Sequence, residues 1–188
     1  MKMFLIVVLI FISSGCFAQK LTEGASLLFK NVKTKLTITE KNEIYTSLNL
    51  KLTKNKKQFT DKADTKESNP YDEIDIFPTD LNKDGKEEIF VSMNSLAGNS
   101  GFALKVFIKN ISGKYNANIL EGLLPQALTS SAEGYPDLML SAPDMPSPIY
   151  HWNGTQYVLY KKISEVTAQK LKATNIDDIS KAYCANIK

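Results

Sequence analysis

Residues 80–88, Asp-Leu-Asn-Lys-Asp-Gly-Lys-Glu-Glu, combine the side chains and the spacing of a loop that binds a hard cation. Calcium takes six to eight oxygen ligands at about 2.3–2.6 Å, and alternate residues of a tight loop can direct several side chains at one centre. Gly85, at position six, permits the left-handed backbone that such a turn requires. The pattern therefore predicts a structural Ca²⁺ site in the 80–88 loop. The predicted ligands are the side chains of Asp80, Asn82, Asp84 and Glu88 and the carbonyl oxygen of Lys86.

The charge around this loop also favours an ion. From Glu67 to Glu88 the chain has eight acidic residues and only two lysines, Lys83 and Lys86, which leaves a local net charge of −6. A hydrated turn without an ion is the alternative, because Asn, Asp and Gly favour turns for conformational reasons alone. An EF-hand is excluded, because position twelve is Val91 rather than Glu and no helical pattern flanks the loop.

The 80–88 loop is followed directly by the apolar run 89–91, and this order resembles the calcium hairpins of FG-GAP and VCBS-type repeat proteins. The resemblance covers residues 77–91, and it extends weakly to 134–138, which looks like the end of a second unit without its Asp-rich loop. It implies that the ion lies between two strands of a hairpin. Asn82 stands where that family has Asp, which should weaken the affinity. The chain is too short for a complete propeller, so the resemblance implies the hairpin only.

Candidate catalytic residues are sparse. Ser100, then Asp137 or Asp144, then the single histidine His151 follow the chain order of a hydrolase triad. However, Ser100 lies in Gly-Asn-Ser-Gly rather than in the G-x-S-x-G elbow, and no strand-turn-helix pattern surrounds it. One histidine also excludes the usual multi-histidine zinc sites. We therefore expect a glycine-rich bend at Ser100, a structural role for His151 and no catalytic residue.

The β region is predicted over residues 71–162, where short runs rich in Ile, Val, Phe, Tyr and Leu alternate with turn residues. Asn153-Gly154, between two such runs, is a strong hairpin signal. With no helical pattern between the runs, they predict an antiparallel β-meander or sandwich of about seven strands. The runs are 74–77, 88–93, 102–108, 114–117, 137–140, 149–152 and 156–160.

Helices are expected on both sides of this β region. Thr37 and Glu40 have the spacing of a capping box, which predicts a helix over 38–48. The Lys-rich, polar segment 53–70 is expected to be an exposed loop. Residues 164–187 are expected to form C-terminal helices, the last with an apolar stripe that packs on the sheet. The fold class predicted is therefore α+β, with a single domain over 19–188.

The N-terminal residues 1–18 have the features of a signal peptide: Lys2, an apolar run of ten residues, and small residues before a cleavage point after Ala18. We expect an exported protein, secreted or periplasmic. Ser-Ser-Gly-Cys16 also resembles the lipobox of bacterial lipoproteins. In this alternative the protein is a lipoprotein anchored through Cys16, and only then does it contact a membrane.

The composition narrows the possible functions. The 188 residues have a net charge of +3, and all 23 basic residues are lysine. Without arginine, specific recognition of nucleic acid is not expected. The sequence favours an exported, non-catalytic binding domain for a protein or glycan ligand. One alternative is a hydrolase that uses carboxylates such as Asp137 and Asp144 with Tyr150. Another is an exported inhibitor or immunity-type protein that blocks a partner enzyme through loop 141–149.

Overall fold

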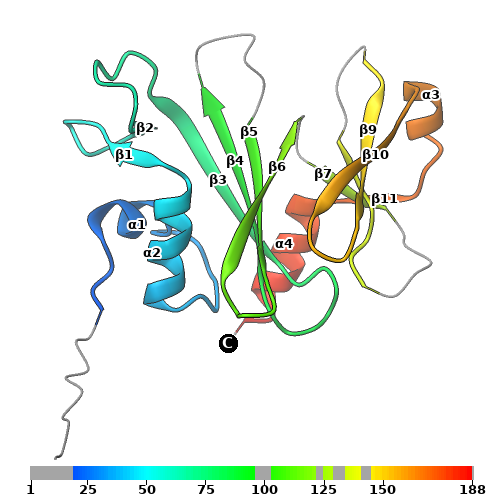
Figure 1. Ribbon diagram of the computed structural model, residues 1–188, viewed down its shortest axis with the longest axis horizontal. Coiled ribbons are helices and arrows are strands. Elements are labelled where there is room, and N and C mark those ends of the chain that lie inside the picture. Colours follow the sequence, from blue (N-terminus) through cyan, green and yellow to red (C-terminus); the bar gives the residue numbers. More distant parts are fainter. Residues whose placement is uncertain (1–18, 96–102, 122–124, 129–133, 141–144, 188) are drawn as a thin grey trace, which may run out of the picture.

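The protein, in a computed structural model, is built mostly from β-strands. The structure describes residues 19–95, 103–121, 125–128, 134–140 and 145–187, so the segment 1–18 with Cys16 lies outside it. Within these ranges there are eleven strands in two antiparallel sheets and four short helices (Figure 1).

Along the chain, two helices are followed by ten strands, then by a short helix, a last strand and a last helix. Their bounds are α1 Glu23–Leu28, α2 Ile38–Ser47, β1 Leu50–Leu52, β2 Phe59–Asp61, β3 Tyr71–Thr79, β4 Glu88–Ser95, β5 Ala103–Lys109, β6 Tyr115–Glu121, β7 Pro125–Leu128, β8 Leu138–Leu140, β9 Ser147–Trp152, β10 Tyr157–Ile163, α3 Glu165–Ala168, β11 Ala173–Asn175 and α4 Ile176–Ala185.

The predicted α+β class with about seven strands is wrong in its class and in its strand number. The seven runs correspond to β3, β4, β5, β6, β8, β9 and β10, and the structure adds β1, β2, β7 and β11. These four have only three or four residues each, too few for an alternating pattern to stand out. Pairing with neighbouring strands, rather than local sequence, makes them strands. One of them, β2, lies inside the segment 53–70 that was expected to be a loop.

The first sheet has the strand order β1-β2-β3-β4-β5-β6, and β3 to β6 form its continuous meander. The β1–β2 hairpin joins this meander through the pair Phe59 and Tyr71. The second sheet has the order β10-β9-β8-β7-β11. Figure 1 shows α1 and α2 on one side of the first sheet and the second sheet on its other side. The molecule therefore has a helix layer and two sheet layers.

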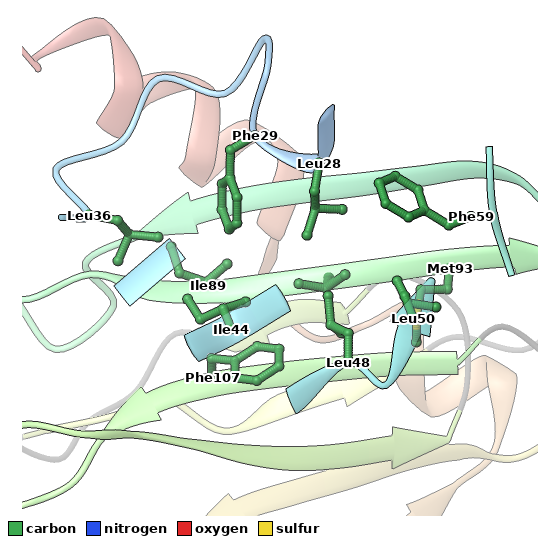
Figure 2. Packing of buried hydrophobic residues seen from close by; sticks show 11 residues of the cluster. Leu28, Phe29, Leu36, Ile44, Leu48, Leu50, Phe59, Ile89, Met93 and Phe107 are labelled. Carbon is green, nitrogen blue, oxygen red and sulfur yellow. The ribbon is translucent and has the colours of Figure 1, made fainter. Parts of the chain in front are cut away.

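Alternation along β4 supplies both faces of the central sheet. Ile89, Val91 and Met93 point to the helix layer, and Phe90 points to the second sheet. Helix α2 starts with a complete capping box at Thr37 and Glu40, and it packs the buried Ile44 on this face. Figure 2 shows the resulting cluster between the helices and the sheet. Its buried members are Leu28, Phe29, Leu36, Ile44, Leu48, Leu50, Phe59, Ile89, Val91, Met93 and Phe107.

A second cluster fills the space between the two sheets. Helix α4 packs against β3, β7 and β11 and contributes the fully buried Ile176 to this cluster. The expected apolar stripe of the last helix therefore contacts the sheets. The buried members are Phe90, Leu104, Val106, Ile108, Leu120, Ala127, Leu138, Leu140, Tyr157 and Ile176.

Candidate metal centre

The 80–88 loop connects β3 to β4, so it is the turn of a β-hairpin. Thr79 pairs with Glu88 at the base of the hairpin, and the Thr79 hydroxyl donates to the Glu88 carbonyl oxygen at 3.3 Å. Two residues of the loop have left-handed backbone, Lys83 at φ +59° and Gly85 at φ +83°. The second of these is the conformation for which glycine was expected at position six.

Three predicted ligand side chains fold back onto the loop's own amides. Asn82 Oδ1 accepts from the Asp84 N–H at 3.2 Å, and Asp84 Oδ1 accepts from the Lys86 N–H at 2.8 Å. Asp80 Oδ2 accepts from the Gly85 N–H at 3.1 Å. These bonds hold the three side chains against the backbone of the turn, and each oxygen keeps a further lone pair.

Asp80 carries the most unusual atom of the loop. Its second oxygen, Oδ1, is buried and has no hydrogen-bond partner in the described structure. The only other such side-chain atom among the described residues is the Tyr183 hydroxyl. A buried carboxylate oxygen without a partner is costly, because it loses its hydration and gains nothing in return. A cation beside Asp80 Oδ1 would remove this cost.

Glu88 is almost completely buried, with 1% of its surface exposed. Its Oε2 accepts from the Leu81 N–H at 2.7 Å, and its Oε1 accepts from the Tyr135 hydroxyl at 2.9 Å. Burial raises the pKa of Glu88 to about 7; the two hydrogen bonds oppose this rise, whereas the charges of Asp80 and Asp84 add to it. A carboxylate held in this way favours a positive charge nearby.

Lys86 was predicted to offer the ion only its carbonyl oxygen, and its side chain forms an ion pair within the loop. Its ammonium group lies 3.7 Å from Asp84 Oδ2, and both side chains are exposed to solvent. No group of three or more His, Cys, Asp and Glu side chains in the described ranges has the arrangement of a metal site. The predicted ligand set contains three such side chains, Asp80, Asp84 and Glu88, and the structure does not arrange them as a metal site, so calcium binding stays a proposal.

Glu87, directly before β4, is also buried, and its partners lie on the helix side of the sheet, opposite to the Tyr135 partner of Glu88. Its carboxylate accepts from the Thr34 hydroxyl at 2.5 Å and from the Lys35 N–H at 2.8 Å. Its backbone carbonyl accepts from the Tyr115 hydroxyl at 3.0 Å. Glu87 thus fixes the segment between α1 and α2 to the start of β4.

The aromatic residues beside Glu88 were not singled out from the sequence as parts of the site. Tyr135 packs its ring 4.5 Å from the Trp152 ring, and Trp152 lies 5.4 Å from Tyr157, measured between ring centroids. Tyr157 in turn donates from its hydroxyl to the Pro136 carbonyl at 2.9 Å. The sequence signal was the weak resemblance at 134–138, which did not indicate a contact with the 80–88 loop.

The candidate catalytic residues are only partly brought together. Asp137 Oδ1 lies 2.7 Å from His151 Nδ1; Asp137 directly precedes β8, and extending the β8–β9 register by one residue puts it opposite His151. The same register puts Tyr150 opposite Leu138, so Tyr150 and Asp137 point to opposite faces of the second sheet. Ser100 and Asp144 lie outside the described residues. The Asp137–His151 contact could have been found from the register of the β8–β9 hairpin.

The structure describes loop 141–149, the predicted segment for blocking a partner enzyme, only from Met145 onward. Met145 is 61% exposed, whereas Ser147 and Ile149 are already buried in β9. The exposed described part of this loop is therefore short.

Comparisons with protein-family models, with curated proteins and with solved structures found no match to this chain. Among the described residues, no helix has the length and apolar character needed to cross a membrane.

Proposed function

We propose that this chain is an exported, non-catalytic binding domain and that its 80–88 loop holds a structural Ca²⁺ ion. The observation that carries the calcium part is the buried, unpartnered Asp80 Oδ1 at the first position of a D-x-N-x-D-G-x-x-E loop. The ligands would be the side chains of Asp80, Asn82, Asp84 and Glu88, the Lys86 carbonyl and water. Export rests on the features of residues 1–18.

The electrostatics of the loop support the same proposal. The negative charges of Asp80 and Asp84 both raise the pKa of the buried Glu88, so each of them opposes the ionisation of Glu88. A divalent cation reverses this effect, since each carboxylate then gains an attractive partner. The loop also closes the β3–β4 hairpin, so an ion there would stabilise the central sheet rather than a peripheral segment.

Thermal unfolding tests the calcium part. Exported proteins meet calcium at millimolar levels, for which sites with a Kd of about 10⁻⁴–10⁻³ M suffice. At ten times Kd, binding to the folded state adds about 1.4 kcal/mol, and we expect Tm to rise by roughly 3–5 °C for a chain of this size. Magnesium should raise Tm less, because it demands a stricter octahedral geometry.

Two variants separate a site in this loop from a general effect of salt. Asp84→Ala should abolish the calcium-dependent rise in Tm, because it removes a central ligand. Asp178→Ala, at an exposed carboxylate in the first turn of α4, should keep the rise and serves as the control. If millimolar calcium leaves the Tm of the wild-type protein equal to that in a chelator, the 80–88 loop is only a turn.

A second measurement locates the ion. Trp152 is the only tryptophan of the chain, and it contacts Tyr135, which donates its hydroxyl hydrogen to Glu88. If calcium binds Glu88, Tyr135 loses or shifts that bond, and the emission of Trp152 should change. The change should saturate over the same calcium range as the rise in Tm, and it should be absent in Asp84→Ala.

A further inference from the structure

A pocket of about 220 Å³ lies between the turns of two hairpins, one from each sheet. The β5–β6 hairpin supplies Ile108, Lys109, Asn110, Ile111 and Asn116, and the β9–β10 hairpin supplies Trp152, Gly154 and Thr155. Both hairpins can be followed in Figure 1. At roughly 30 Å³ for each water molecule, the pocket has the volume of about seven waters, which suits one small ring.

The walls of this pocket are fixed by side chains within each turn. Asn110 Oδ1 accepts from the Ser112 N–H, the Ser112 hydroxyl and the Lys114 N–H. Asn153 Oδ1 accepts in the same way from the Thr155 N–H, the Thr155 hydroxyl and the Gln156 N–H. A pocket between two such turns is preorganised, so little ordering cost accompanies binding.

The lining presents no unpaired charged group to a ligand. No acidic residue lines the pocket, and its one lysine, Lys109, pairs with Glu40 at 2.5 Å and lies 5.1 Å from the Tyr115 ring centroid. Glycine, amide, hydroxyl and apolar groups make up the rest. This composition argues against an anion or a cation as the ligand and for a neutral molecule.

Two groups in the lining have hydrogen-bond donors without an acceptor among the described residues. The indole N–H of Trp152 meets no acceptor in the described part of the chain, and it is not among the buried unpaired atoms. The Asn116 side chain accepts one bond from Asn110 through its oxygen and leaves its amide hydrogens unused within those residues. These are donors for hydroxyl oxygens.

The pocket also presents apolar surface where polar residues are usual. Ile111 is fully exposed at the tip of the β5–β6 turn, a position that normally carries a polar residue. Trp152 is held by Tyr135 and Tyr157, so its ring cannot easily turn away. The pocket thus combines an apolar contact and an aromatic ring with unused hydrogen-bond donors. A ligand with one apolar C–H face and hydroxyl groups at its rim would match both.

We infer that this pocket binds a neutral sugar ring, with Ile111 and Trp152 against its C–H groups and Trp152 Nε1, Asn116 and Thr155 bonded to its hydroxyls. The inference rests on the proposed binding function and deepens it by naming a glycan as the ligand. No residue of the 80–88 loop lines the pocket, so sugar binding and calcium binding can be tested separately.

The test uses the full mature protein and the emission of its single tryptophan. Neutral monosaccharides and short neutral oligosaccharides of glucose, galactose, mannose and N-acetylglucosamine are titrated separately, in calcium and in a chelator. At least one sugar should shift the Trp152 emission with a millimolar or lower Kd, and isothermal calorimetry should give the same Kd. If no sugar of the panel binds in either buffer, the inference is wrong, whatever calcium does to Tm.

Variants then distinguish this pocket from another surface. Ile111→Ser and Asn116→Ala should each weaken binding about fivefold or more while Tm stays unchanged, since both side chains are exposed. Ile119→Ser is the matched control. Ile119 is 70% exposed and lies on β6, as Asn116 does, but it does not line the pocket. Equal losses for Ile111→Ser and Ile119→Ser would place the sugar elsewhere and overturn the inference. Binding in calcium but not in the chelator would still support the pocket if Ile111→Ser abolished it.

Discussion

Replacing Glu88 by glutamine should change how the stability of the calcium-free protein depends on pH. Glutamine keeps the shape of the side chain, its oxygen can still accept from the Leu81 N–H, and its amide can donate to the Tyr135 hydroxyl. Only the negative charge is lost. Because Glu88 is 1% exposed, solvent screens this charge poorly.

The magnitude follows from the raised pKa. The pKa of Glu88 is about 7 in the folded protein, against an ordinary value of 4.5, with burial as the main cause. Since each pH unit of such a difference corresponds to about 1.4 kcal/mol, ionising Glu88 costs the folded state about 3 kcal/mol. The protonated form stabilises the fold below about pH 4.5, and this stability is lost as the pH rises through about 7.

We therefore expect the wild-type protein in a chelator to lose roughly 2–3 kcal/mol of this contribution between about pH 5 and about pH 8. For a chain of this size, that corresponds to a fall in Tm of roughly 5–10 °C. Glu88→Gln should remove this fall and be more stable than the wild type at the alkaline end. Saturating calcium should flatten the curve of the wild type but not alter that of Glu88→Gln, which lacks a ligand.

Urea unfolding at several pH values, with Tm as a second measure, provides the assay. Glu43→Gln is the control for simple loss of an acidic charge, because Glu43 is exposed on α2. Its curve should remain parallel to that of the wild type. If Glu88→Gln is also parallel to the wild type in a chelator, the carboxyl of Glu88 is already ionised without cost and the reasoning from its burial is wrong.

Two further predictions concern other parts of the chain. Gly24→Ala should destabilise the protein by about 1–2 kcal/mol in urea unfolding, because the added Cβ would lie 2.1 Å from Tyr45 Cζ, and the loss should shrink in a Tyr45→Leu background. Mass spectrometry of the exported protein should show Gln19 as its first residue; an acylated Cys16 would select the lipoprotein alternative, and an intact Met1 would contradict export.

The sequence predicted the elements whose signals are local. Thr37 and Glu40 indicated the start of α2, and the structure has the complete capping box there. The continuous apolar run of Ile89, Phe90 and Val91 indicated β4, and in the structure these residues supply both clusters. Such patterns are visible because each depends on neighbours within a few residues.

The elements that the sequence missed depend on distant partners. β11, with only Ala173–Asn175, exists through its pairing with β7, nearly fifty residues earlier in the chain. Helix α1 has six residues and a single Thr22 cap, too short for a periodic signal. A strand of three residues carries too little sequence to indicate the strand with which it pairs. The prediction therefore missed four strands and gave the class as α+β, whereas the structure is mostly β.

The candidate site was predictable in its residues but not in its surroundings. Spacing alone selected Asp80, Asn82, Asp84 and Glu88, whereas the burial of Glu88 results from residues such as Tyr135 that come forty-seven positions later. The two hairpin turns that form the neutral pocket come from different sheets, so no local pattern could indicate that they meet.

The adjacent acids Glu87 and Glu88 explain why an ion at this hairpin would affect the whole fold. In an extended strand they point to opposite faces, so Glu87 binds the segment at Thr34 and Lys35 on the helix side, and Glu88 binds Tyr135 on the side of the second sheet. All three layers therefore meet at the first residues of β4. A cation that fixes the 80–88 loop would hold Glu88 in its ionised form, and through the strand it would also fix the position of Glu87. A single turn could then stabilise both faces of the central sheet.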